Sequence, residues 1–439
     1  MTTGVVDLES SAPAAAGKTA RPLLPAVCLL LGCLSFVVYA VSTRSVLDLM
    51  ALPFANETLH VAHSLATDGR FADPFGWVQV HTGYTAHLAP VYPFLVGLVY
   101  RGYGNGLATL TILWVANIVF LSVQMALLPY LSVRMGLGVS PGVVAAALGI
   151  LLFPFAVDFE WESLLAGMEL ALLCLLATKG LRATTSAATL ALTGCLWGMA
   201  LLTNPAAVLL LAPWAVAIAW SQAPERRAAK MRQFAGIAAI TLLVCAPWIV
   251  RNRIRLGAFF FIRDNLGIEL SVSNNDCASA SLAGNVKSGC HFVTHPNLSE
   301  PLQKDVAALG EYRFNQRELR RAISWIAAHP KRFAILTGER FAMFWFPSQG
   351  LAHYRRLPLV VWGITIASFV GLARLWRRHR VPAWILGGAL LAYPLVYYLV
   401  QFEPRYRDPI LWVSLLLAGY ALAAMLPESW RRRLEAAAG

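Results

Sequence analysis

Residues 23–42 read LLPAVCLLLGCLSFVVYAVS and include no charged side chain. A helix needs roughly 20 apolar residues to cross the hydrocarbon core of a bilayer, and this stretch is long enough. Further segments are similarly apolar: 107–131, 142–157, 162–178, 187–203, 205–220, 234–250, 357–373, 382–400 and 407–426. The sequence therefore predicts an all-α polytopic membrane protein with about ten transmembrane helices.

The composition of the 439-residue chain agrees with this fold class. Hydrophobic residues make up 58% and charged residues only 13%, whereas a soluble globular chain has about 25% charged residues. The net charge of +13 reflects 36 Lys and Arg against 23 Asp and Glu, and most of the cations flank predicted spans. Because these cations form no single basic face, we do not expect a nucleic-acid partner.

The distribution of arginine and lysine sets the expected orientation, because short cytoplasmic loops are enriched in both. An even number of spans places both chain ends and three basic clusters in the cytoplasm. The clusters are Arg226, Arg227, Lys230 and Arg232; Arg374, Arg377, Arg378 and Arg380; and Arg431, Arg432 and Arg433. The chain then divides into a disordered cytoplasmic tail (1–22), a transmembrane catalytic module (23–250) with a first outer loop (43–106), an outer, periplasmic loop region (251–356), C-terminal transmembrane helices (357–426) and a cytoplasmic tail (427–439).

The two long outer loops are predicted to contain helices that lie in the membrane interface. Residues 54–66 have helical character, residues 91–100 are apolar but too short to span, and residues 332–346 mix aromatic with charged side chains. The last of these is alternatively an eleventh span. The second loop also holds Cys277 and Cys290, the two cysteines outside predicted spans. Since that loop faces the oxidising side, we predict a disulfide between them.

Carboxylates at the outer ends of predicted spans are candidate catalytic groups. Glu57 opens a helical stretch with His60 one turn later, and a carboxylate at the membrane surface is suited to act as a general base. Stabilisation of a first-turn acid by the helix dipole is the alternative explanation. Asp158 and Glu162 belong to a short outer loop, either as further catalytic carboxylates that bind the acceptor or a metal, or as solvated loop residues.

The polar loop between the first two outer helices is a candidate for substrate binding. Residues 69–93 are rich in Gly, Pro, His and aromatic side chains, and loops of this kind often have functional residues. Turn formation alone also explains the Gly and Pro positions. The candidate substrate-binding residues here are His60, His81, Thr85, His87 and Tyr92.

Arginines on the predicted outer side run against the charge bias of short loops and indicate an anionic ligand. The guanidinium group offers a planar set of donors that matches phosphate. The alternative is that these side chains only anchor helices at the interface. The candidates are Arg251, Arg253, Arg263, Arg340, Arg405 and Arg407, with Glu403 and Tyr406 in the same segment as the last two.

An ordered set of short segments resembles a known family. The segments are Asp73-Pro74-Phe75, residues 82–86 and 90–93, Leu202-Thr203-Asn204-Pro205, residues 246–252, 310–312 and 325–330, and Glu403-Pro404-Arg405-Tyr406-Arg407. Together they resemble the bacterial membrane glycosyltransferases of the GT-C superfold, in the branch related to protein O-mannosyltransferases and the lipid A aminoarabinose transferase. The resemblance covers residues 23 to 426.

The resemblance implies an inverting glycosyltransferase in the bacterial cytoplasmic (inner) membrane. Such enzymes take a sugar from a polyprenyl-phosphate-linked donor and transfer it on the outer face of the membrane. Glu57 matches the family's acid in the first outer loop, and Arg251, Arg253 and Arg405 match its lipid-phosphate site. The acceptor (lipid A, protein or another glycan) and the sugar stay open. No particular cofactor is implied. A divalent metal is compatible with the sequence but is not implied by ligand spacing, because no Cys or His cluster has the spacing of zinc ligands.

Two other functions remain compatible with the sequence. One is a relative that binds polyprenyl phosphate without catalysis. The other is a transporter or flippase for a lipid-linked anion, which would be expected to have charged or broken helices at the bilayer midplane. Most charges here lie at the ends of predicted spans instead.

Overall fold

The computed structural model describes residues 23–49, 56–75, 80–104, 106–153, 161–180, 186–348 and 357–436. Within these ranges the chain is helical and has no strand, apart from isolated bridges that join Ala72 to Tyr84 and Ser281 to Phe402. The all-α architecture expected from the apolar segments is therefore present.

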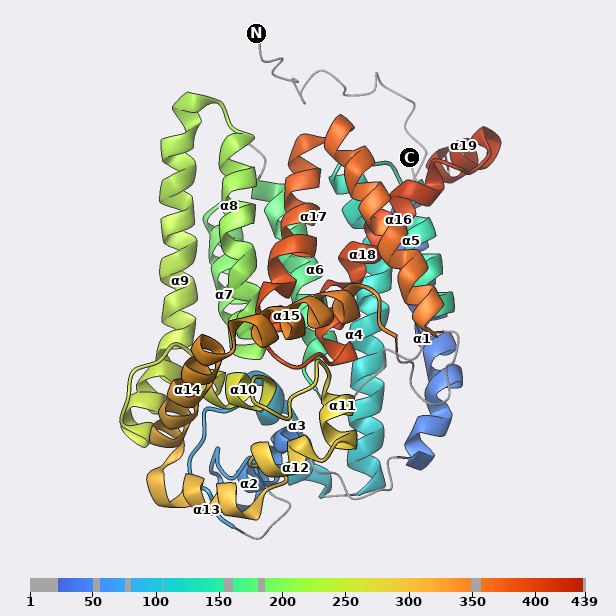
Figure 1. Cartoon of the computed structure of the whole chain (residues 1–439). Helices are drawn as coiled ribbons and strands as arrows, with labels where there is room; N and C mark the ends of the chain where they lie inside the picture. The colour runs from blue at the N-terminus through green and yellow to red at the C-terminus, as the bar shows by residue number, and fades with distance from the viewer. Residues whose placement is uncertain are drawn as a thin grey trace.

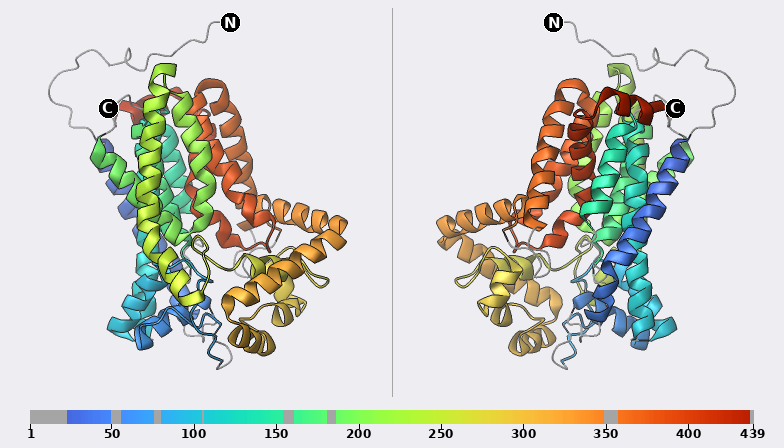
Figure 2. Two further views of the ribbon diagram at one scale, coloured as in Figure 1. Left: turned by 90° about the vertical axis from the view of Figure 1, so that its left-hand side faces the viewer. Right: turned by 90° about the vertical axis from the view of Figure 1, so that its right-hand side faces the viewer.

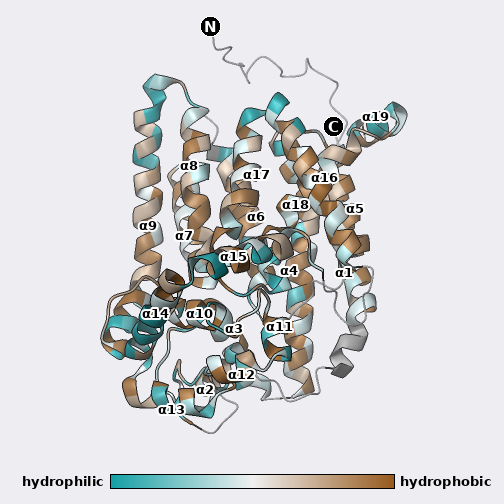
Figure 3. Ribbon diagram, in the orientation of Figure 1, coloured by the Kyte–Doolittle hydropathy of each residue, from teal (hydrophilic) through white to brown (hydrophobic). Residues whose placement is uncertain are grey.

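A bundle of roughly parallel helices forms the main body (Figure 1). Each predicted span overlaps helices of this bundle, although 205–220, 382–400 and 407–426 are each divided between an α-helix and a 3-10 helix, and 154–157 lie outside the described residues. Figure 3 shows that the bundle is the most hydrophobic part of the protein. Among the described residues, five helices are long and apolar enough to cross a membrane, and shorter apolar helices cover Ser140–Leu152, Ala187–Thr203 and Pro205–Trp220. The bundle consists of α1 (Leu24–Leu49), α4 (Leu107–Arg134), α5 (Ser140–Leu152), α6 (Ser163–Gly180), α7 (Ala187–Thr203), η2 (Pro205–Leu210), α8 (Leu211–Trp220), α9 (Pro224–Leu256), α16 (Leu357–Arg378), α17 (Arg380–Ala392), η3 (Tyr393–Tyr398), η4 (Pro404–Ile410) and α18 (Leu411–Ala423).

Glycines allow two pairs of bundle helices to approach closely. A Cβ atom at Gly371 of α16 would lie 1.9 Å from the carbonyl oxygen of Leu417 on α18. A Cβ atom at Gly419 of α18 would lie 2.3 Å from the carbonyl oxygen of Pro141 on α5. Small residues at such contacts are typical of membrane helix pairs, which associate largely by van der Waals packing. The glycines therefore fix α18 between α5 and α16.

A second layer of helices covers one end of the bundle, opposite to the end at which α8 meets α9 (Figures 1 and 2). It combines segments from both long loops: α2 (Glu57–Asp68), α3 (Val91–Tyr103), α10 (Leu266–Ser273), α11 (Leu282–Lys287), α12 (Cys290–Thr294), α13 (Glu300–Leu309) and α14 (Glu311–Ala328). Phe75, Ile268, Val272, Val306 and Phe314 form a separate small core inside this layer. We call these helices the loop layer.

The remaining helices do not run parallel to the helices of the bundle. α15 (Pro330–Trp345) runs across the bundle between it and the loop layer, which is the arrangement expected for an interfacial helix rather than an eleventh span (Figure 1). The predicted C-terminal tail contains α19 (Glu428–Ala436), a helix that projects sideways from the other end of the bundle. The predicted N-terminal tail, 1–22, lies outside the described residues.

Cys277 and Cys290 form a disulfide in the structure. The bridge closes a segment of the loop layer that contains α11 and ends at the first residue of α12. It therefore ties down the helix that presents His291 to the cavity described next.

Candidate active site

A cavity of about 610 Å³ lies between the bundle and the loop layer. Both layers supply polar side chains to its wall, and residues far apart in the sequence meet there. The ionisable and aromatic polar groups that line it are Glu57, His87, Glu162, Arg263, Glu269, His291, His295, Tyr397, Glu403, Arg405 and Tyr406. Seven of these, Glu57, His87, Glu162, Arg263, Glu403, Arg405 and Tyr406, are among the candidates selected from the sequence.

Glu57 is the first residue of α2 and projects into this cavity. The helix begins there because the side chain of Asn56 caps it, accepting a hydrogen bond from the Thr58 backbone N–H at 2.7 Å. Only 8% of Glu57 is exposed. Burial raises the pKa of Glu57 to about 7. The nearby charge of Glu269 also raises this pKa, whereas the charge of Arg405 lowers it. A carboxylate with this pKa can accept a proton at neutral pH.

His295 faces Glu57 as a neutral side chain. Its Nε2 atom lies 3.9 Å from Glu57 Oε1, and burial lowers the pKa of His295 well below its ordinary value. Its Nδ1 atom accepts a hydrogen bond from the Asn297 backbone N–H at 3.0 Å. The proton of the neutral ring is therefore on Nε2, directed at the carboxylate of Glu57.

His87 closes the other side of Glu57. Burial lowers the pKa of His87 to about 3, and the charge of Arg263 lowers it as well. Arg263 Nε donates to the His87 carbonyl oxygen at 2.8 Å, which fixes the backbone of the loop at this residue. The His87 ring is held by edge contact with Phe75, at 5.0 Å between ring centroids. His87 is thus a neutral, positioned ring next to the candidate base.

Donor atoms of Glu57, His87 and His295 all lie within 4.8 Å of one another, close enough to hold a metal ion. The hydrogen bonding of His295 does not fit that role. A metal ligand needs a lone pair on the coordinating nitrogen, whereas the bond from the Asn297 backbone leaves the proton on Nε2. We therefore assign no metal to this cluster and derive no step through one.

Two arginines, Arg263 and Arg405, line the cavity. Arg405 forms a salt bridge with Glu403 and its guanidinium lies 3.5 Å from the centre of the Trp161 ring. Tyr406 stacks on Tyr397 with 4.3 Å between ring centroids. Together with Arg263, Arg405 can offer charged donors to an anion inside the cavity.

Arg251 lies in a different cavity from Arg405, of about 620 Å³. Its guanidinium donates to the carbonyl oxygens of Thr85 at 2.6 Å and Phe71 at 2.8 Å, and it lies 4.7 Å from the centre of the Trp248 ring. Its donors are therefore used in holding the first outer loop against α9. The sequence prediction that Arg251 and Arg405 share one anion site does not agree with this placement.

Three further candidate arginines make contacts with the protein itself. Arg340 is fully buried and donates to Asn274 Oδ1 and the Leu399 carbonyl. Arg407 donates to the carbonyls of Phe344 and Trp345 and to Thr365 Oγ1. Arg253, in the last turn of α9, donates to the carbonyl of Gly257, which ends that helix. None of the three lines the candidate active site, and their hydrogen bonds connect helix ends instead.

The other candidates lie outside the cavity. Thr85 donates to the carboxylate of Glu311, Tyr92 accepts from Asn117 Nδ2 at 2.8 Å, and His81 is exposed beside Asp73. His60 lies on α2 but does not line the cavity. Asp158 falls outside the described residues.

Sequence reasoning missed several residues of the cavity wall. Glu269, His291, His295 and Asn297 all come from the second long loop. The spacing of His291 and His295 could have indicated them, because residues four apart lie on one helical face, and His291 directly follows Cys290. Their proximity to Glu57 depends on how the two loops pack, which no local pattern encodes.

Solved structures with a similar fold are membrane glycosyltransferases. The Archaeoglobus fulgidus oligosaccharyltransferase, tethered with an acceptor peptide containing the NVT sequon, matches with a TM-score of 0.54 and 13% sequence identity, over 91% of this chain and 49% of that chain. A second structure of that enzyme, a complex with Zn and sulfate, matches with a TM-score of 0.54 and 13% identity over 94% and 50% of the two chains. This chain has the GT-C fold. It spans about half the length of the oligosaccharyltransferase.

ArnT from Cupriavidus metallidurans bound to undecaprenyl phosphate also matches, with a TM-score of 0.40 and 13% identity over 90% of this chain and 77% of that chain. A TM-score of this size does not show that the two chains share a fold. No protein-family profile matches the sequence, and no curated protein matches it at the level of sequence. The match to the oligosaccharyltransferase therefore establishes the GT-C fold. Because the sequence identity is only 13%, the activity is argued from the site.

Proposed function

We propose that this protein is an inverting glycosyltransferase that moves a sugar from a polyprenyl-phosphate-linked donor to an acceptor. The observation that supports it most is the position of Glu57. This carboxylate is buried in a cavity between the bundle and the loop layer, with a pKa raised to about 7 by burial. The GT-C fold and the sequence resemblance point to the same class of reaction.

The proposed reaction is a single displacement at the anomeric carbon of the donor sugar. A phosphate monoester leaves well without a proton, so the protein needs mainly positive charge near the departing oxygens. Arg405 and Arg263 in the cavity wall are the groups that would supply it. Glu57 would remove the proton from the acceptor hydroxyl as the new glycosidic bond forms. One base and one direct displacement invert the anomeric configuration.

His295 lies beside Glu57 as a neutral ring. Its Nε2 atom is 3.9 Å from Glu57 Oε1, which is beyond hydrogen-bond distance, so the ring does not lower the basicity of Glu57 by donating to it. His87 is neutral as well. Neither ring adds a positive charge that would favour the ionised carboxylate.

The reaction is proposed to take place on the outer face of a bacterial cytoplasmic membrane. The basic clusters at 226–232, 374–380 and 431–433 support this, since they all belong to the end of the bundle away from the cavity, and cationic loops favour the cytoplasm. The acceptor is of a class that reaches that face, such as lipid A, a protein or a glycan.

The function is tested by mass spectrometry of membrane lipids and envelope glycans from a deletion strain. A transferase predicts that one sugar modification disappears while its polyprenyl-phosphate-linked donor accumulates, and that both changes reverse with the wild-type gene. Unchanged lipids and glycans would contradict the proposal. Accumulation of the donor only on the cytoplasmic side would point to a flippase instead.

A further inference from the structure

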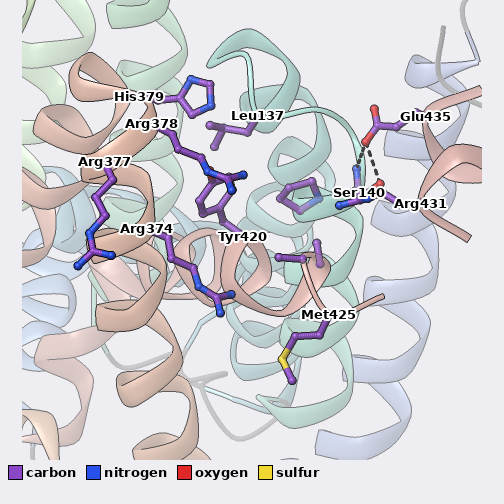
Figure 4. A pocket seen from close by; sticks show the side chains of 13 residues that line it. Leu137, Ser140, Arg374, Arg377, Arg378, His379, Tyr420, Met425, Arg431 and Glu435 are labelled. Atoms are coloured by element: carbon purple, nitrogen blue, oxygen red, sulfur yellow. Dashed lines mark hydrogen bonds between the residues drawn. The ribbon is translucent and has the colours of Figure 1, made fainter. Parts of the chain in front are cut away.

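A second cavity, of about 520 Å³, lies at the end of the bundle opposite to the candidate active site (Figure 4). Its walls are the ends of α5, α16 and α18, together with α19. Four arginines line it, Arg374, Arg377 and Arg378 from α16 and Arg431 from α19. It shares no residue with the candidate active site.

Arg374 lies one helical turn before both Arg377 and Arg378, because it is spaced three and four residues from them. Like charges at these spacings repel and weaken the helix. Among the described residues, none of the four cavity arginines has a carboxylate within salt-bridge distance. The one contact of this set is a hydrogen bond from Arg374 to the Ala421 carbonyl at 2.9 Å. The charge bias of cytoplasmic loops accounts for arginines at this end, but does not require four of them to line one cavity.

The carboxylate in the cavity wall, Glu435, is used elsewhere. It accepts hydrogen bonds from the backbone N–H groups of Val139 at 2.9 Å and Ser140 at 3.0 Å, and from Ser140 Oγ at 2.8 Å. Glu435 therefore caps the start of α5 and attaches α19 to the bundle, as Figure 4 shows. The cationic side of the cavity is left to a ligand from outside the chain.

The same cavity has an apolar side. Leu137, Tyr420 and Met425 line it beside the arginines. Trp430, on the neighbouring α19, is 63% exposed, and exposed tryptophan next to arginine is typical of helices at a membrane interface. A free phosphate needs only the cations, whereas a phospholipid needs cations for its headgroup and an apolar surface for the start of its chains.

We propose that this cavity binds the phosphate headgroup of an anionic membrane phospholipid. Basic pockets between transmembrane helices on the cytoplasmic side are known to suit such headgroups. Four arginines line the cavity, and α19 forms one of its walls. The proposal does not depend on the transferase activity, because the two cavities lie at opposite ends of the bundle.

The test is native mass spectrometry of the full chain in detergent with phosphatidylglycerol or phosphatidylcholine of the same acyl chains. Arg377→Gln/Arg378→Gln removes two cavity cations that have no hydrogen bond or salt bridge among the described residues. Arg226→Gln/Arg227→Gln is the matched control, because it removes two exposed arginines from the same end of the bundle, outside the cavity. Thermal unfolding of both variants checks that they fold.

Phosphatidylglycerol affinity should fall roughly 10-fold or more in the cavity variant and by less than about 2-fold in the control. Phosphatidylcholine should bind more weakly than phosphatidylglycerol to the wild type. Equal losses in both variants, or no loss in the cavity variant, would overturn the proposal. Displacement of the lipid by inorganic phosphate at a similar concentration would show a free-phosphate site and overturn the assignment to a lipid.

Discussion

Glu57 is the residue on which the proposed chemistry depends, and its environment makes a pH prediction. The carboxylate must be ionised to accept a proton, and burial raises the pKa of Glu57 to about 7. Below that pH the group is protonated and inactive. We expect kcat/KM for sugar transfer to rise about 10-fold per pH unit below about 7 and to level off above it. The measurement is initial rate from pH 5.5 to 8.5 in proteoliposomes.

Substitution of Glu269, a neighbour of Glu57, checks the direction of the pH effect. Glu269 lines the same cavity, and its negative charge raises the pKa of Glu57. Glu269→Gln removes that charge, so the rising limb of the profile should move to lower pH. A profile that moves to higher pH, or a wild-type rate that falls between pH 6 and 8, would remove Glu57 as the titrating base.

The hydrogen bonding of His295 predicts that transfer needs no added metal. Because Nδ1 of His295 accepts from the Asn297 backbone, its Nε2 has the proton and offers no lone pair next to Glu57. We expect the transfer rate to stay within about 2-fold of its original value after dialysis against EDTA. A loss of activity that Mg²⁺, Mn²⁺ or Zn²⁺ restores would contradict this reading of the cluster.

At the scale of the helices, two glycines of α16 give a matched pair. A Cβ at Gly371 would clash with the Leu417 carbonyl of α18, whereas a Cβ at Gly363 would meet nothing within 4 Å. Overpacking at a tight contact costs about 1–3 kcal/mol, while alanine is favoured over glycine in a helix by about 1 kcal/mol. Gly371→Ala should lower the Tm in detergent by several degrees and Gly363→Ala should not. Equal shifts would show that the contact between α16 and α18 is looser than described.

The helices could be predicted from the sequence much better than the site. Apolar stretches such as 107–131 and 187–203 match α4 and α7 within a few residues, because in a membrane every backbone polar group must bond within its own helix. The membership of the site depends on tertiary contacts instead. Arg251 and Arg405 look alike locally, yet one holds a loop through backbone carbonyls and the other lines the cavity. Glu57 and His295 meet only because two distant loops pack together.

For the whole molecule, the proposed topology places the α8–α9 turn and the loop layer on opposite sides of the membrane. Arg227 lies in α9 close to that turn, and Lys287 lies on α11 in the loop layer. Single cysteines at these two positions, in a background without the native thiols of the spans, should react with an impermeant maleimide from opposite sides. Labelling of both from one side would contradict the topology and the outer-face location of the candidate site.

Sugar transfer by Glu57→Gln is the measurement that tests the account most directly. The substitution keeps the shape of the side chain and removes its basicity, so folding and donor binding should survive while the transfer rate falls about 10²–10⁴-fold. Glu300→Gln is the matched control, because it makes the same change on a half-exposed residue of α13 whose salt-bridge partner among the described residues is Lys304. Its rate should stay within about 2-fold of wild type. A Glu57→Gln variant that transfers sugar from a purified polyprenyl-phosphate donor as fast as Glu300→Gln would show that Glu57 is not the base.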